Sequence, residues 1–215
     1  MRFAEAAGRI AVLPGMRGIL PFMPFMVLAA VNYFSPAVAY GAAAICCFFL
    51  ISPFAPVKPE WPAYFAWNRV NWRWLPWVAT GLFLLSIGLT KLIFSVIIRS
   101  NPEMQPLLRE LIQLRGWRLT LFFFIVTVPV PLIEEWVFRH YLFGGLVKWL
   151  GWIGAATATS LIFAAMHLYW PIMPGLFLLG MAWQLIYLRS GSLGYAVLLH
   201  SGNNAITMLI ALLTA

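Results

Sequence analysis

Residues 119–148 read LTLFFFIVTVPVPLIEEWVFRHYLFGGLVK, and this stretch decides the fold. It is apolar over more than the roughly 20 residues that one membrane-spanning helix needs, yet two glutamates and an arginine lie inside it. Pro129 and Pro131 cannot donate helical hydrogen bonds from their own nitrogens. We therefore predict a spanning helix that kinks or restarts at these prolines. If it restarts at Pro131, both glutamates fall in the first turn of the new helix.

The whole chain has the composition of a polytopic membrane protein. Of its 215 residues, 63% are hydrophobic and 9% are charged, whereas a soluble domain carries about 25% charged residues. The expected fold class is all-α, a membrane helix bundle of about seven (six to eight) transmembrane helices with a kinked fourth span. We treat residues 1–215 as a single integral membrane domain. The predicted spans lie at residues 18–34, 36–53, 75–97, 119–148, 152–169, 171–188 and 192–213.

The charge balance favours lipid over nucleic acid as the surrounding partner. The chain has 14 Lys and Arg against six acidic residues, a formal net charge of +8. These charges are scattered singly between apolar runs, as expected of loops near anionic lipid head groups. The sequence therefore predicts contact with a lipid bilayer and no nucleic-acid partner. The short loops are typical of a multi-pass protein of a bacterial inner (cytoplasmic) membrane.

The two glutamates of the fourth span indicate a functional site. A single central Asp costs about 2.5–3.5 kcal/mol on membrane-insertion scales, so carboxylates at membrane depth usually have a task. On a helix Glu135 and Arg139, four positions apart, share one face and can form an ion pair. Glu134 points about 100° away. One carboxylate is then held by arginine, and the other is available as a general base.

Two histidines lie in later spans at a compatible depth. His167 follows Phe163 by four positions, and Asn204 follows His200 by four, so each pair shares one helix face. The sequence midpoint between Glu134 and His167 falls at Leu150 and Gly151, where we predict the turn of a helical hairpin. Glu134, His167 and His200 should therefore meet in one hydrated pocket.

At these residues the chain resembles the CPBP family of intramembrane proteases, also called the CAAX protease and bacteriocin-processing family. The family pattern is two glutamates with an arginine four after the second, then Phe-x-x-x-His, then His-x-x-x-Asn. Here it reads EEWVFR at 134–139, FAAMH at 163–167 and HSGNN at 200–204, within a catalytic core of approximately residues 119–213. His140 departs from the pattern, in which a small residue, usually Gly, follows the arginine.

The resemblance implies an endopeptidase that cuts membrane-associated or lipid-anchored protein tails. Its catalytic residues would be Glu134 and His167, which activate a water, and His200 and Asn204, which donate hydrogen bonds to the oxyanion. Glu135, Arg139 and Phe163 would support them. We predict a glutamate-type protease without a cofactor.

A metal-dependent version stays open, because Glu134, His167 and His200 are an acceptable zinc set. Two other functions also stay open: a proton-coupled transporter and a non-catalytic immunity or binding protein. Lys91 in the third span favours transport, although a lysine near a helix end can extend to the membrane interface.

Overall fold

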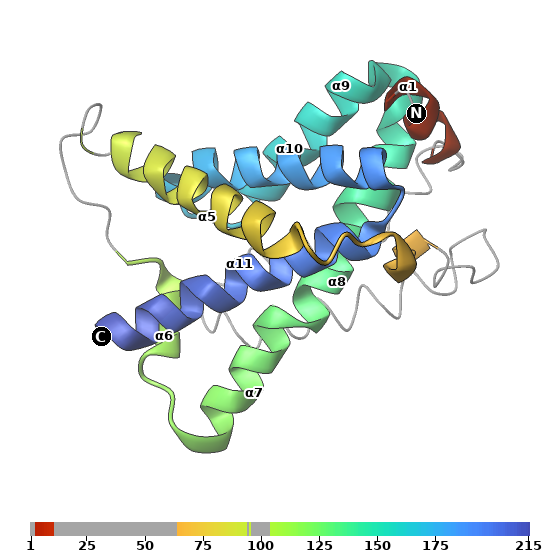
Figure 1. The fold of residues 1–215 in the computed structure, drawn as a ribbon. Coiled ribbons are helices and arrows are strands. Elements are labelled where there is room, and N and C mark those ends of the chain that lie inside the picture. The colour runs from red at the N-terminus through yellow and green to blue at the C-terminus, as the bar shows by residue number, and fades with distance from the viewer. Residues whose placement is uncertain (1–2, 11–63, 94, 96–103) are drawn as a thin grey trace.

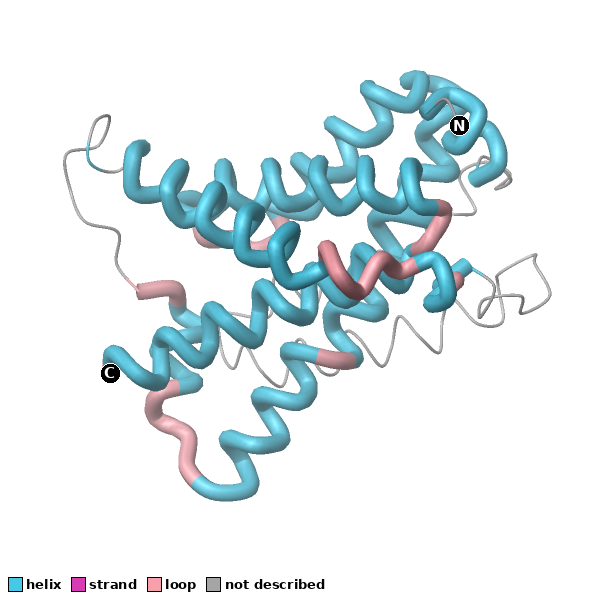
Figure 2. Tube along the Cα trace, viewed as in Figure 1, coloured by secondary structure: helices cyan, strands magenta, loops and turns pink. Residues whose placement is uncertain are grey.

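The computed structural model describes residues 3–10, 64–93, 95 and 104–215. Among these residues the regular structure is entirely helical, without strands (Figures 1 and 2). The elements are α1 (Phe3–Ile10), the short 3-10 helix η3 (Trp67–Arg69), α5 (Leu75–Leu92), α6 (Pro106–Leu111), α7 (Gly116–Thr127), α8 (Pro129–Glu135), the π-helix η5 (Trp136–Leu142), α9 (Phe143–Ala165), the 3-10 helix η6 (Trp170–Ile172), α10 (Met173–Ser190) and α11 (Leu193–Thr214).

The helices confirm the predicted membrane fold for the described part of the chain. Four stretches there are long and apolar enough to cross a membrane: Leu75–Leu92, Gly116–Ala165, Trp170–Ser190 and Leu193–Thr214. They correspond to the third to seventh predicted spans, because the 50-residue stretch contains both the fourth and the fifth. The predicted spans at 18–34 and 36–53 lie outside the described residues.

The fourth span is kinked, as predicted, and the kink lies at Val128. This residue has φ −119° and ψ −75° and separates α7 from α8, which begins at Pro129. Proline is tolerated in the first turn of a helix, where its missing N–H has no helical acceptor, so Pro129 and Pro131 both fit into one helix start. Glu134 and Glu135 are consequently the last two residues of α8, and their expected place in a first turn is wrong.

The predicted hairpin turn is present at Gly151, which breaks α9 with φ 65° and ψ 174°. The rings of Phe138 and Phe163 are 5.3 Å apart, although 25 positions would separate them by roughly 37 Å along a straight helix. The second arm of α9 therefore folds back against η5 and brings Phe163 beside Arg139, whose guanidinium carbon lies 4.7 Å from the ring centre.

Helices α10 and α11 form a second hairpin, joined by a tight turn. Gly191 ends α10 in the left-handed conformation (φ 66°), which glycine adopts without a steric penalty. The hydroxyl of Ser192 accepts a hydrogen bond from the backbone N–H of Tyr195 and donates one to the carbonyl of Phe65, at 2.7 Å. The segment around Phe65 thereby ties the start of α11 to the residues that precede α5.

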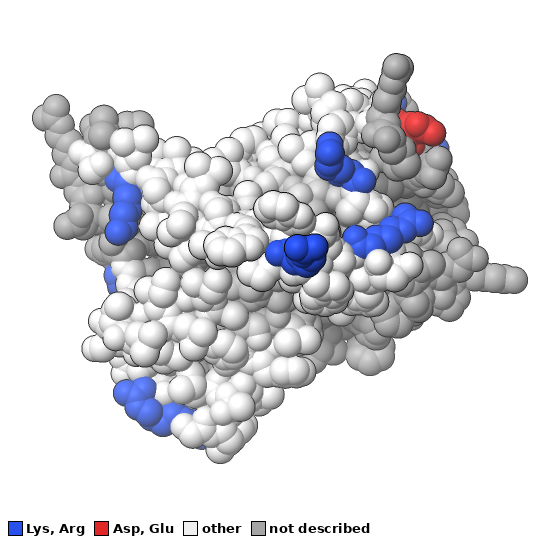
Figure 3. Space-filling model, viewed as in Figure 1, with Lys and Arg blue, Asp and Glu red and all other residues white. Residues whose placement is uncertain are grey.

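The core forms where these helices meet. Helix α10 packs on both α9 and α5, and α11 packs on α7 and α8 (Figure 1). On the face seen in Figure 3, Lys and Arg atoms form separate groups on a largely uncharged surface. The main buried cluster contains Val70, Val130, Ile133, Val137, Phe138, Tyr141, Phe163, Leu179, Trp183, Tyr195, Ala196 and Leu199.

Candidate active site

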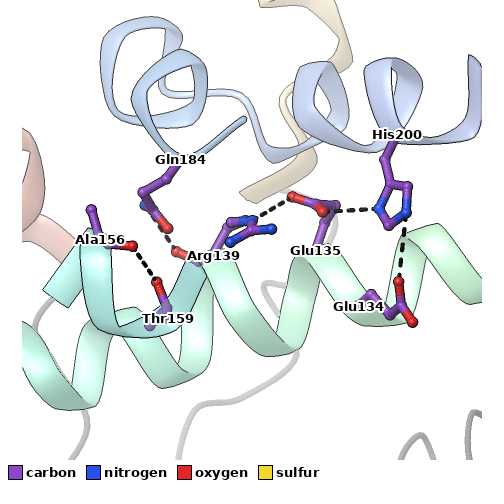
Figure 4. Close-up of polar contacts among 7 residues, drawn as sticks. All are labelled: Glu134, Glu135, Arg139, Ala156, Thr159, Gln184 and His200. Atoms are coloured by element: carbon purple, nitrogen blue, oxygen red, sulfur yellow. Dashed lines mark hydrogen bonds and ion pairs between the residues drawn. The ribbon is translucent and has the colours of Figure 1, made fainter. Parts of the chain in front are cut away.

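A chain of buried charged and polar groups links α8, η5 and α11 (Figure 4). The Nε of Arg139 donates to Oε2 of Glu135 at 3.0 Å, and both side chains are completely buried. Nδ1 of His200 lies 3.0 Å from the other oxygen of Glu135, and its Nε2 lies 3.5 Å from Oε2 of Glu134. The predicted Glu135–Arg139 pair is thus present, and His200 spans both carboxylates.

Aromatic rings enclose the cationic side of this network. Trp183 stacks on the imidazole of His200 with ring centres 4.3 Å apart, and the ring of Phe163 stands nearly perpendicular to that imidazole, 5.7 Å away. Phe138, Phe163 and Trp183 also lie within 6 Å of the Arg139 guanidinium. Aromatic faces stabilise nearby cations, so these rings hold Arg139 where few hydrogen-bond acceptors are present.

His167 lies just beyond the end of α9, beside the supporting Phe163. Its Nδ1 is 2.9 Å from the carbonyl oxygen of Phe163, and the two rings are 4.9 Å apart. A hydrogen bond from Nδ1–H to a backbone carbonyl fixes the imidazole orientation and leaves Nε2 as the nitrogen that can act on a substrate or water.

Asn204 has a partner that its sequence position did not indicate. Its side-chain amide donates to the backbone oxygen of Val126 at 3.0 Å. Val126 lies just before the kink at Val128, where regular helical hydrogen bonding is interrupted. Asn204 therefore links α11 to the kinked span that carries Glu134.

Three of the four predicted catalytic residues line one cavity of about 340 Å³: Glu134, His167 and Asn204. This volume lies within the range of small-ligand pockets, roughly 300–1,000 Å³. His200 does not line the cavity but lies behind Glu134, whose carboxylate it faces. Glu134 is therefore the group through which the buried network reaches the cavity.

The sequence did not reveal the contribution of α10 to this site. Trp183 supports His200, and the amide of Gln184 donates to the backbone oxygen of Arg139 at 3.3 Å. Gly180 lies against the network, because a Cβ there would come within 3.3 Å of Nη2 of Arg139. Gln184, a glutamine in an apolar span, is a sequence signal that could have pointed to α10, since a buried amide needs partners.

The unusual His140 forms its own contact away from the cavity. Its Nδ1 is 2.9 Å from the hydroxyl of Tyr187, and the ring of Tyr64 packs 4.2 Å from the imidazole. The larger side chain at this position is accommodated by a hydrogen bond to α10.

The described residues contain no group of three or more His, Cys, Asp or Glu placed to hold a metal ion. The zinc set considered from the sequence is accordingly not assembled here. Nε2 of His200 faces the carboxylate of Glu134, while Nδ1 of His167 is bonded to a backbone carbonyl.

Fold and site together define a helical integral membrane protein. Its spans contain a buried network of glutamate, arginine and histidine, and Glu134 of this network borders a cavity between the spans. Residues 116–206, which include all the predicted site residues, match the family described as type II CAAX prenyl endopeptidase Rce1-like. The chain is also 28% identical over 148 residues to the membrane-embedded CAAX protease MroQ of Staphylococcus aureus (strain USA300). That match covers 65% of this chain and 59% of the relative, so the chain covers less than two thirds of MroQ.

These matches confirm the resemblance to the CPBP family of intramembrane proteases, and residues 116–206 are similar to the Rce1-like type II CAAX prenyl endopeptidases. No solved structure matches the chain.

Proposed function

We propose that this protein is an intramembrane endopeptidase in which Glu134 activates a water molecule. The observation that carries this proposal is the position of Glu134. Its carboxylate faces His200 within the buried network, at 3.5 Å, and also borders the cavity with His167. A general base must be fixed in place and must also reach the reactants, and Glu134 satisfies both conditions.

These placements support a reaction by general-base catalysis. Glu134, oriented with His167, takes a proton from water, and the resulting hydroxide attacks the peptide carbonyl carbon. The carbonyl oxygen becomes negatively charged and accepts hydrogen bonds from Asn204 and His200. When the C–N bond breaks, the amine leaves with the proton that Glu134 had accepted.

His200 can serve the oxyanion through one particular nitrogen. Its Nδ1 is held at 3.0 Å by Glu135, whereas the Nε2 contact with Glu134 is longer, at 3.5 Å. We assign Nε2 to the oxyanion, because it is released when Glu134 takes up the water proton and loses its charge. Since His200 lies behind Glu134 and outside the cavity lining, this role requires its imidazole to reach past that carboxylate once the contact is released. Removing one such donor typically costs about 2.7–4 kcal/mol of transition-state stabilisation.

Substrate and location are inferred from the family. We propose membrane-associated or lipid-anchored protein tails as substrates, since the matched family is described as CAAX prenyl endopeptidases. The relative from Staphylococcus supports a bacterial inner membrane as the location.

The test compares membrane-protein termini by mass spectrometry in cells that express the native protein or the Glu134→Gln variant. We expect new termini with the native protein and none with Glu134→Gln, at equal amounts of inserted protein. Glu110→Gln is the matched control, because Glu110 does not line the cavity, and it should give the native pattern. Termini that persist in the Glu134→Gln variant would remove Glu134 from the mechanism.

The same substrate then decides metal dependence. We expect cleavage by purified protein in detergent to survive prolonged chelation. Loss of cleavage with rescue by zinc alone would assign the reaction to a metal-bound water.

A further inference from the structure

The cavity beside Glu134 carries charges of opposite sign on two different helices. Of the described side chains that line it, two have a formal charge: Glu134 at the end of α8 and Lys91 in the last turn of α5. Apart from the imidazole of His167, the other described lining residues are apolar or neutral and polar. Among the described residues, a ligand in this cavity therefore meets one anion and one cation.

None of the described residues pairs with Lys91. In the part of the chain that the structure describes, no hydrogen bond or ion pair joins its ammonium group to another side chain. Ionisable side chains in spanning helices are costly and usually mark a functional site. A lysine at a helix end can reach the interface without any task, but this one borders the cavity that also contains Glu134.

The neutral part of the lining suits a short peptide. Hydroxyl and amide groups of Ser86, Asn203 and Thr207 can bond to a peptide backbone, and apolar side chains surround them. A carboxylate on that peptide is repelled by Glu134 and attracted by Lys91. The two charges therefore favour one orientation of a peptide whose scissile bond lies at Glu134.

We propose that Lys91 binds a carboxylate of the peptide substrate and so fixes its orientation and the position of cleavage. This proposal rests on the peptidase function proposed above and adds a specificity-determining residue to it. The carboxylate has two sources with the same chemistry, the C-terminus of the substrate or an Asp or Glu side chain. In both cases the bond that is cut lies at a fixed separation from the anionic group.

Direct binding tests the proposal without requiring turnover. The probes are fluorescently labelled, apolar hexapeptides, measured by anisotropy with the full chain in nanodiscs. One pair differs by a C-terminal carboxylate or carboxamide, and a second, amidated pair carries one Glu or one Gln. The proteins are the native chain, Lys91→Gln, Lys91→Arg and the control Lys148→Gln, because Lys148 lies outside the cavity lining.

We expect the native protein to bind the anionic member of one pair roughly tenfold more tightly, a preference in the range of one hydrogen bond to a charged group. Lys91→Gln should abolish that preference, whereas Lys91→Arg and Lys148→Gln should retain it. The pair that shows the preference identifies the source of the carboxylate.

Three results would overturn the proposal: no binding of any peptide, equal affinity for both members of each pair, or a preference that survives in Lys91→Gln. The peptidase function has an independent test in Glu134→Gln. If the native protein shows no charge preference but its cleavage still requires Glu134, the Lys91 subsite fails and the peptidase mechanism stands.

Discussion

The buried pair between Glu135 and Arg139 provides the sharpest test of the network. In Arg139→Met, Glu135 keeps only the 3.0 Å contact with Nδ1 of His200 and loses the bond from Arg139, also 3.0 Å. Both side chains are completely buried in the native protein, so solvent screens little of the uncompensated negative charge that remains on Glu135. Removing one partner of a buried ion pair costs about 3–5 kcal/mol, and we expect Arg139→Met to lose about that much free energy of unfolding.

The assay is reversible unfolding in mixed micelles, applied as a double-mutant cycle. Glu135→Gln with Arg139→Met removes both charges together, and we expect the double variant to be at least about 2 kcal/mol more stable than the sum of the single effects predicts. Lys148→Met, which removes an exposed cation from the same helical stretch, should change stability by less than about 0.5 kcal/mol. Single effects that add to within about 0.5 kcal/mol would show that the two side chains do not stabilise the fold as a pair.

Two further substitutions on α10 test its role beside the site. Gly180→Ala places a Cβ 3.1 Å from Oγ of Ser160, and we expect about 1–3 kcal/mol of destabilisation in the same unfolding assay from this overpacking. Gly88→Ala, where no described atom lies within 4 Å, should instead stabilise by about 0.5–1 kcal/mol, and equal signs for the two would refute the argument. Trp183→Leu removes the ring stacked 4.3 Å from the imidazole of His200. We expect it to lower kcat roughly two- to twelvefold, the value of one aromatic pair, with little change in KM, and an unchanged kcat would contradict the role of Trp183.

Much of the architecture could be predicted because apolar length and proline chemistry act locally. Five predicted spans correspond to described helices, and both the kink and the break at Gly151 lie within a few residues of their expected positions. The Glu135–Arg139 contact follows from helical spacing alone, and it is present at 3.0 Å. Each of these predictions depends on residues that are close in sequence.

Contacts between distant segments were less predictable. Asn204 was expected to face a substrate, but its amide also bonds to Val126, a partner that depends on how α11 crosses the kinked span. His200 was expected to face the pocket directly, whereas it lies between two carboxylates. The role of Trp183 comes from the packing of α10 on α9 and α11, and no spacing between residues in the sequence indicates it. Helix crossing angles and the depth of each span decide these contacts, and periodicity in one sequence does not specify them.

The π-helix between Trp136 and Leu142 restricts how the length of this protein can vary. Each residue added to or lost from a helix rotates everything that follows by about 100°, so a one-residue change between Glu135 and Gly151 would turn the returning arm and its Phe163 away from Arg139. Widened turns of this kind accommodate one extra residue within an otherwise regular helix. We therefore expect related chains to diverge through substitutions around the cavity and, between Glu135 and Gly151, to tolerate a gain or loss of a single residue only within these seven positions.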